Sequence, residues 1–320
     1  MKRRLVWLGI AVAGVLAASV AAMSLCATTG HPTVLSALGT PSRSAAMLGL
    51  LEQPGPLEVE TVVSADWAVD RSNIINMEHP EAIRAGLKEG DEPIQVYFHV
   101  VRHPKWGTFI IDTGVEKALQ NDPDHAAFNG FIAGYMHLDR LKFRQPLGDW
   151  IQQHGGILNG VFFTHLHLDH VTGLPDVPRQ TPLYAGPTEA HHRGLLNVFS
   201  RSGLDRGFDG RPALNEWAFR ADPDGRFAGV VDVFGDGSLF ALFGPGHTSG
   251  STAYLARSTK GPVLFTGDTA STVWGWEHQV EPGAFTDDHV LDAKSLAALH
   301  KLVEEHPTID VRLGHQALRR

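Results

Sequence analysis

The chain has 320 residues, of which 43% are hydrophobic and 19% are charged, and its formal net charge at pH 7 is −8. This balance is typical of a globular protein, and the length suits one large domain or two small ones. The acidic charge, without a basic stripe, argues against nucleic acid as the main partner. The single cysteine, Cys26, excludes an internal disulfide bond.

The first 26 residues have the pattern of an export signal or a membrane anchor. Basic residues at positions 2–4 precede an uncharged stretch, residues 5–25, that is rich in Ala, Val and Leu. Small residues at 20–22 form a candidate cleavage site, while the stretch is also long enough to remain as a membrane-spanning anchor. Cys26 is a third possibility, as a lipidated residue after cleavage. We therefore expect a periplasmic, secreted or membrane-anchored protein that faces away from the cytoplasm.

The next segment leads into a domain that begins with strands. Residues 27–57 show little periodicity, and we expect a linker or lead-in to a single domain over residues 58–320. Alternating apolar residues at 57–63 predict a strand. Two further apolar runs, residues 94–102 and 107–114, predict the strands of a hairpin.

Helical spacing follows the hairpin and returns near the end of the chain. Over residues 115–155, the apolar positions that recur at helical spacing are Phe128, Phe131, Ile132, Tyr135 and Leu138. The stretch 147–155 looks like the end of a helix that stops at Gly155-Gly156. A second helix is predicted at 292–306, with Asp292 as its N-terminal cap.

Four apolar runs share one pattern, because each is followed by a histidine or an aspartate. Those runs and the residues that follow them are 157–163 with His165, 238–244 with His247, 262–267 with Asp268, and 308–314 with His315. Strand ends that present polar residues at one rim are a common way to build a site on a sheet. Strands mixed with helices, without a strict alternation, predict a layered fold of both types.

The stretch THLHLDH at 164–170 is the densest in residue types that bind metals. It offers His165, His167, Asp169 and His170 within six residues. Imidazole and carboxylate groups are the usual ligands of zinc and similar metals. One ion cannot easily take all four from so short a segment, whereas two ions about 3.5–4 Å apart can. The sequence therefore predicts a two-metal site.

Further motifs support this interpretation in chain order: FIIDTG (109–114), GPGHTSGSTAYL (244–255), LFTGD (264–268) and LGH (313–315). With THLHLDH, they resemble the metallo-β-lactamase superfamily of hydrolases. The intervals between the ligand candidates, and the helical insert before His165, are most similar to the N-acyl homoserine lactonase branch. The resemblance implies an α+β fold, an αββα sandwich with the metal site at one rim between the two sheets.

The resemblance also implies a role for each ligand candidate. The first metal would take His165, His167 and His247, and the second would take Asp169, His170 and His315. Asp268 would bridge both, so that Asp169 and Asp268 serve catalysis as well as metal binding. Asp112 would orient the histidine loop without binding metal, or would simply be a turn residue. Zinc is the default metal for this ligand set, and iron, manganese or cobalt could occupy it as well.

The reaction implied is hydrolysis of a small molecule by a metal-bridging hydroxide. A lactone or ester such as an N-acyl homoserine lactone is the expected substrate. Hydrolysis of a phosphodiester, thioester or β-lactam is the alternative, as is a non-catalytic metal-binding module. Two departures leave the substrate open, since Thr269, Ala270 and Ser271 stand where many lactonases have a tyrosine, and Gln316 stands where the branch often has an aspartate. The oligomeric state is open.

Two other stretches carry candidate pocket residues. After Asp268, the segment 272–283 contains Trp274, Trp276 and His278, which either line an apolar pocket or belong to the core. His191 and His192 are expected on a helix over the site. The long interval 193–238 could form a lid or a partner contact.

Overall fold

The computed structural model describes residues 27–194 and 197–318. The predicted signal or anchor at residues 1–26, including Cys26, lies outside the described residues. Within the ranges that are described, no helix combines the length and the apolar character needed to cross a membrane.

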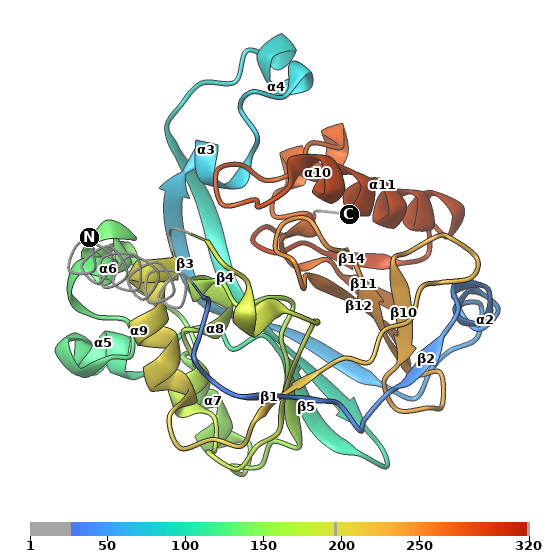
Figure 1. Ribbon diagram of the computed structural model, residues 1–320, viewed down its shortest axis with the longest axis horizontal. Helices are drawn as coiled ribbons and strands as arrows, with labels where there is room; N and C mark the ends of the chain where they lie inside the picture. Colours follow the sequence, from blue (N-terminus) through green and yellow to red (C-terminus); the bar gives the residue numbers. More distant parts are fainter. Residues whose placement is uncertain (1–26, 195–196, 319–320) are drawn as a thin grey trace, which may run out of the picture.

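Two sheets lie face to face between outer layers of helices, which confirms the αββα sandwich (Figure 1). The larger sheet has eight strands, and its last four form the antiparallel part. Their spatial order is β1 (Thr33–Leu35), β9 (Leu214–Glu216), β8 (Leu183–Ala185), β7 (Gly160–Phe162), β5 (Gly107–Ile111), β4 (Asp91–His103), β3 (Glu58–Asp70) and β6 (Lys142–Phe143). The hairpin predicted at 94–114 is confirmed as β4 and β5.

The smaller sheet has six strands and is antiparallel except for the pair β13 and β14. Their spatial order is β14 (Asp310–Arg312), β13 (Gly261–Phe265), β12 (Thr252–Ser258), β11 (Leu239–Phe243), β10 (Gly229–Asp232) and β2 (Thr40–Ser42). All four apolar runs that precede a ligand candidate are confirmed as strands: β7, β11, β13 and β14.

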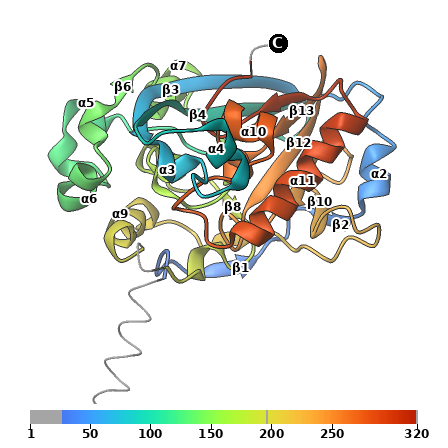
Figure 2. The same cartoon turned by 90° about the horizontal axis from the view of Figure 1, so that it is seen from above.

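The helices gather in two outer layers, as the two views show (Figures 1 and 2). Beside the larger sheet are α5 (Ala118–Asn121), α6 (Gly130–Tyr135), α7 (Leu147–Gln153), α8 (Leu168–Val171) and α9 (Asn197–Phe208). The smaller sheet carries α2 (Ser44–Leu48), α10 (Val273–His278) and α11 (His289–Glu305). Two more, α3 (Arg71–Ile74) and α4 (Pro80–Ala85), follow β3. Short 3₁₀ turns are Pro123–His125, Leu138–Arg140, Leu174–Asp176, Glu189–His191 and Gly267–Thr269.

Apolar packing divides the core into three layers that match this architecture. The central layer joins the two sheets, with Phe162 and Trp217 from one side and Tyr254 and Phe265 from the other. A second cluster lies between the larger sheet and its helices, and a third lies under α10 and α11. Because burial of apolar surface is the main favourable term in folding, these layers hold the sheets in a fixed relation to each other.

The lead-in at 27–57 runs along both sheets. Its strand β1 pairs in parallel with β9 at the edge of the larger sheet. Its strand β2 pairs antiparallel with β10 at the edge of the smaller sheet. This segment therefore contributes to both sheets as well as leading into them.

Two details of the helices differ from expectation. The cap of α11 is Asp288, whose carboxylate accepts a hydrogen bond from Leu291 N, and Asp292 instead lies buried in the first turn. In the insert after β5, Phe128, Ile132 and Leu138 are buried, but Phe131 and Tyr135 are 69% and 54% exposed. Phe131 and Tyr135 follow helical spacing, but α6 is short and only the side that carries Ile132 packs against the core.

Replacement of Tyr254 by Phe tests the central layer. The Tyr254 hydroxyl accepts from Trp217 Nε1 at 3.0 Å and donates to Phe163 O at 2.9 Å. Tyr254→Phe leaves both buried groups without a partner, so we expect the free energy of unfolding in urea to fall by about 1–3 kcal/mol. Tyr135→Phe removes the same atom from an exposed side chain and should change it by less than about 0.5 kcal/mol. Equal effects of the two substitutions would contradict this role of Tyr254.

Candidate metal centre

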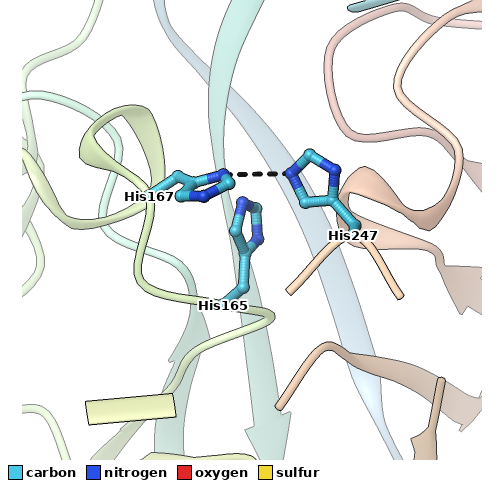
Figure 3. Close-up of side chains that lie close together, drawn as sticks. All are labelled: His165, His167 and His247. Carbon is cyan, nitrogen blue, oxygen red and sulfur yellow. Dashed lines mark hydrogen bonds between the residues drawn. The ribbon is translucent and has the colours of Figure 1, made fainter. Parts of the chain in front are cut away.

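Three histidines converge at the rim where β7 and β11 end (Figure 3). His165 and His167 come from the loop after β7, and His247 comes from the loop after β11. Each offers a ring nitrogen, and these nitrogens lie within 4.8 Å of one another. The shortest separation is 3.0 Å, between His167 Nδ1 and His247 Nε2. Such a group of three imidazoles suits one transition-metal ion.

A second group lies next to the first and is richer in carboxylates. It consists of Asp169, His170, Asp268 and His315, whose ligand atoms also lie within 4.8 Å of one another. His315 Nε2 lies 3.1 Å from Asp169 Oδ2 and 3.2 Å from Asp268 Oδ2. The structure thus brings together all seven residues for which the sequence predicted metal binding.

Asp268 stands between the two groups. Its Oδ1 lies 3.4 Å from His170 Nε2, and its Oδ2 lies 3.7 Å from His247 Nε2. The next strand approaches closely, since a Cβ atom at Gly314 would lie 2.1 Å from Asp268 Oδ1. A glycine is needed there to leave the carboxylate room.

The donor set fits divalent cations. His165 Nε2, His170 Nε2 and Asp268 Oδ1 are buried atoms with no hydrogen-bond partner among the described residues. Buried polar atoms normally have a partner, because leaving one unsatisfied is costly. A cation shared among these atoms would satisfy them together. Imidazole and carboxylate ligands in this number are typical of zinc and of related metals.

Protonation in this site follows burial and charge. Burial lowers the pKa of His165 and of His167, and it lowers that of His247 to about 3. These three rings are therefore neutral and can offer a lone pair to a metal. Burial acts against ionisation of Asp268, but the neighbouring His315 and His170 hold the pKa of its carboxyl well below the usual value. Asp268 is therefore a carboxylate.

Three of the candidate ligand histidines, His170, His247 and His315, are oriented from behind by a second contact. Asp112 Oδ2 lies 2.8 Å from His170 Nδ1, and Asp112 Oδ1 accepts from Thr164 N at 2.8 Å. Asp112 also has a φ of 56°. It therefore serves both as a turn residue after β5 and as the residue that positions His170. His247 Nδ1 lies 3.1 Å from Thr286 Oγ1, and His315 Nδ1 lies 3.0 Å from Gln95 O. Contacts of this kind fix the ring orientation of metal ligands.

Two buried acids, for which the sequence predicted no role at this site, support the loops that carry the candidate ligands. Glu189 accepts from Leu166 N at 2.9 Å and from Gly250 N at 2.9 Å, so it ties the loop of His165 to that of His247. Asp292 accepts from His247 N at 3.1 Å. The only local feature of the sequence that could have indicated a role for Glu189 is its position shortly after strand β8, because the other site residues also follow strands.

A cavity opens over the candidate metal ligands and is lined by residues of several elements. One part of its wall is apolar and includes Trp67, Ile74, Ile94, Ile132 and Met136. The cavity reaches the candidate metal ligands His167, Asp169, His247 and Asp268. Its remaining wall contains the pair His192 and Asp287, with Nε2 and Oδ2 3.0 Å apart.

The aromatic residues after Asp268 belong elsewhere. Trp276 is buried in the core beneath α11, with its ring 5.0 Å from that of His300. Trp274 stacks on His278 at 4.4 Å, and neither residue lines the cavity. Of the two histidines expected over the site, His192 lines the cavity, while His191 is exposed.

Comparison with known proteins agrees with this arrangement. Residues 91–315 match the family model of the metallo-beta-lactamase superfamily. A relative named N-acyl homoserine lactonase AttM, from Azorhizobium caulinodans, is 32% identical over 65% of this chain and 78% of its own length. Its namesake from Agrobacterium fabrum is 30% identical over 70% of this chain and 83% of its own length.

Solved structures share the fold. A crystal structure of a B. thuringiensis AiiA mutant with N-decanoyl-L-homoserine at its active site has a TM-score of 0.56 and 18% identity, and covers 82% of this chain and 94% of that one. AidC, described as a dizinc quorum-quenching lactonase, has a TM-score of 0.54 and 13% identity, and covers 82% of this chain and 88% of its own.

Replacement of Asp112 by Asn tests the support behind the second ligand group. An amide keeps the shape of the side chain but removes the charge that holds His170 Nδ1. We expect metal affinity at this ligand group to fall about 10–100-fold, measured by metal content after competition with a series of chelators. Asp209→Asn, at an exposed acid beyond α9, is the control. Unchanged metal affinity in the Asp112 variant would show that this contact is not needed.

Proposed function

We propose that this chain, which belongs to the metallo-β-lactamase superfamily, hydrolyses the lactone ring of N-acyl homoserine lactones with the help of two divalent cations. The observation that carries the proposal is the placement of Asp268. Its two oxygens face histidines of both ligand groups, as a carboxylate shared by two cations would. The similarity to relatives named as lactonases supports the choice of bond.

The chain's own residues divide the work of holding the cations. His165, His167 and His247 would hold one, and Asp169, His170 and His315 would hold the other, with Asp268 shared. When bound, such cations supply the Lewis acidity and the activated water that hydrolysis needs. Zinc is the default choice for these ligands, while iron, manganese and cobalt remain compatible with them.

The cavity supports a substrate with an apolar tail. Its wall of Trp67, Ile74, Ile94, Ile132 and Met136 offers an acyl chain an apolar surface next to the metal ligands. The positions where many lactonases carry a tyrosine do not reach this cavity. Residues 269–271 are buried beneath the rim and do not line it. Contacts with the polar part of the substrate must therefore come from other elements.

The pair of His192 and Asp287 is suited to hold that polar part. The backbone N of Asp287 donates to His247 O at 3.0 Å, which fixes the residue beside a metal ligand. One carboxylate oxygen faces His192 Nε2 at 3.0 Å, and the other can accept from the amide N–H of an N-acyl substrate. A carboxylate here also disfavours anionic substrates such as phosphodiesters, because like charges repel.

A substrate panel with the Asp268→Ala variant tests the proposal. We expect turnover of acyl homoserine lactones to exceed that of thioesters, phosphodiesters and β-lactams, and about two metals per chain. Asp268→Ala should lose most of both metal and turnover, because the remaining ligands cannot bind two cations close together. Asp209→Ala is the control for removal of an acid. If Asp268→Ala kept its metals and its turnover, the shared role of Asp268 would be wrong.

Replacement of Asp287 by Ala tests how the substrate is oriented. We expect kcat/KM for an acyl homoserine lactone to fall about tenfold, which corresponds to the loss of one hydrogen bond. For a γ-lactone with an alkyl tail and no amide, the fall should be much smaller. His191→Ala, at the exposed neighbour of His192, is the matched control. A fall of the same size for both lactones would mean that Asp287 acts through His247.

A further inference from the structure

A group of large apolar side chains lies exposed on two neighbouring helices. Phe131 and Tyr135 on α6 are 69% and 54% exposed, and Val198 and Phe199 on α9 are 46% and 45% exposed. The ring of Phe131 lies 6.2 Å from that of Tyr135 and 5.3 Å from that of Phe199. These four residues are called the mouth cluster below. Both views show α6 and α9 at the same end of the molecule (Figures 1 and 2).

The mouth cluster continues into the cavity over the metal ligands. Tyr135 and Phe199 line that cavity, together with Ile132, one turn back on the same helix as Tyr135. Other exposed apolar residues, such as Ile83 and Ile157, do not line it. An apolar patch at the entrance of a site is more often an interaction surface than a chance exposure.

The described chain also begins at this entrance. Thr28 lines the cavity, and its backbone N donates to His192 O at 2.9 Å. Ala27 pairs with Arg193, and Thr29 Oγ1 donates to Asp205 on α9 at 2.5 Å. The described chain is therefore held against the fold from Ala27 onward.

The sequence before Ala27 has the composition of a signal or an anchor for the membrane. It starts with basic residues at 2–4, continues with 21 uncharged residues at 5–25, and ends in Cys26. A spanning segment at 5–25 or a lipid on Cys26 would place the bilayer within a residue or two of the cavity entrance. Aromatic side chains are enriched where proteins meet the membrane interface.

We propose that the mouth cluster docks on the surface of a phospholipid bilayer, so that the cavity opens towards the membrane. A terminal anchor and an apolar patch act together, since two membrane contacts bind more firmly than one. The inference deepens the proposed function, because acyl lactones with long tails partition into bilayers and would reach the cavity from there. The docking itself does not depend on the identity of the substrate.

The experiment uses the full chain with vesicles of phosphatidylethanolamine and phosphatidylglycerol. An environment-sensitive fluorescent amino acid is placed at position 131 or 135. The control is position 157, where Ile157 is 73% exposed and precedes β7 at the end away from the metal ligands. With docking, we expect a blue shift and several-fold stronger quenching by doxyl-labelled lipids at 131 and 135 than at 157.

Three results would overturn the proposal. Equal quenching at 131 and 157 would mean that the cluster stays in water beside the membrane. A blue shift that grows with protein concentration, without quenching by labelled lipids, would show that a second copy of the chain covers the mouth cluster. A blue shift that is present without vesicles and does not depend on protein concentration would show that residues 5–25 of the same chain cover the mouth cluster. None of these measurements uses a substrate. The docking result can therefore be interpreted even if the chain proves not to hydrolyse lactones.

Discussion

The contact between the Asp268 carboxylate and the imidazoles of His170, His247 and His315 is the constraint on which the rest of the structure depends. A buried carboxylate is costly without positive or hydrogen-bonded partners. These partners follow three different strands, β7 of the larger sheet and β11 and β14 of the smaller sheet. The sheets must therefore meet face to face with their ligand-bearing ends at one rim, and the central apolar layer holds them there.

Outer carboxylates make that rim rigid. Asp112 holds the histidine loop after β7, Glu189 joins that loop to the one after β11, and Asp292 holds His247 from the side of α11. Each of these acids is buried and contacts a backbone N–H, so its effect is on the position of a loop. A metal centre built from separated segments needs such support, because the ligands must be placed before the ions arrive.

The parts of the site that the sequence could predict are those with a local pattern. His165, His167, Asp169 and His170 lie within one motif, and Asp268 directly follows a strand, so a resemblance to known motifs was enough to group them. The sequence predicts Asp292 as a helix cap because a cap pattern is local, whereas its contact with His247 joins residues 45 positions apart. For Trp276 the sequence left a pocket wall and the core as alternatives, and the structure places it in the core beneath α11.

The strands β1 and β2 have a consequence for how the molecule is made. Strand β1 pairs with β9 at residues 214–216, and β2 pairs with β10 at residues 229–232. Both early strands therefore pair with strands from the second half of the chain. The sheet edges that β1 and β2 form cannot be completed until most of the polypeptide has been synthesised. Pairings between distant residues form slowly, because a long loop must close first. In a nascent chain, β1 and β2 would therefore stay unpaired until late in synthesis.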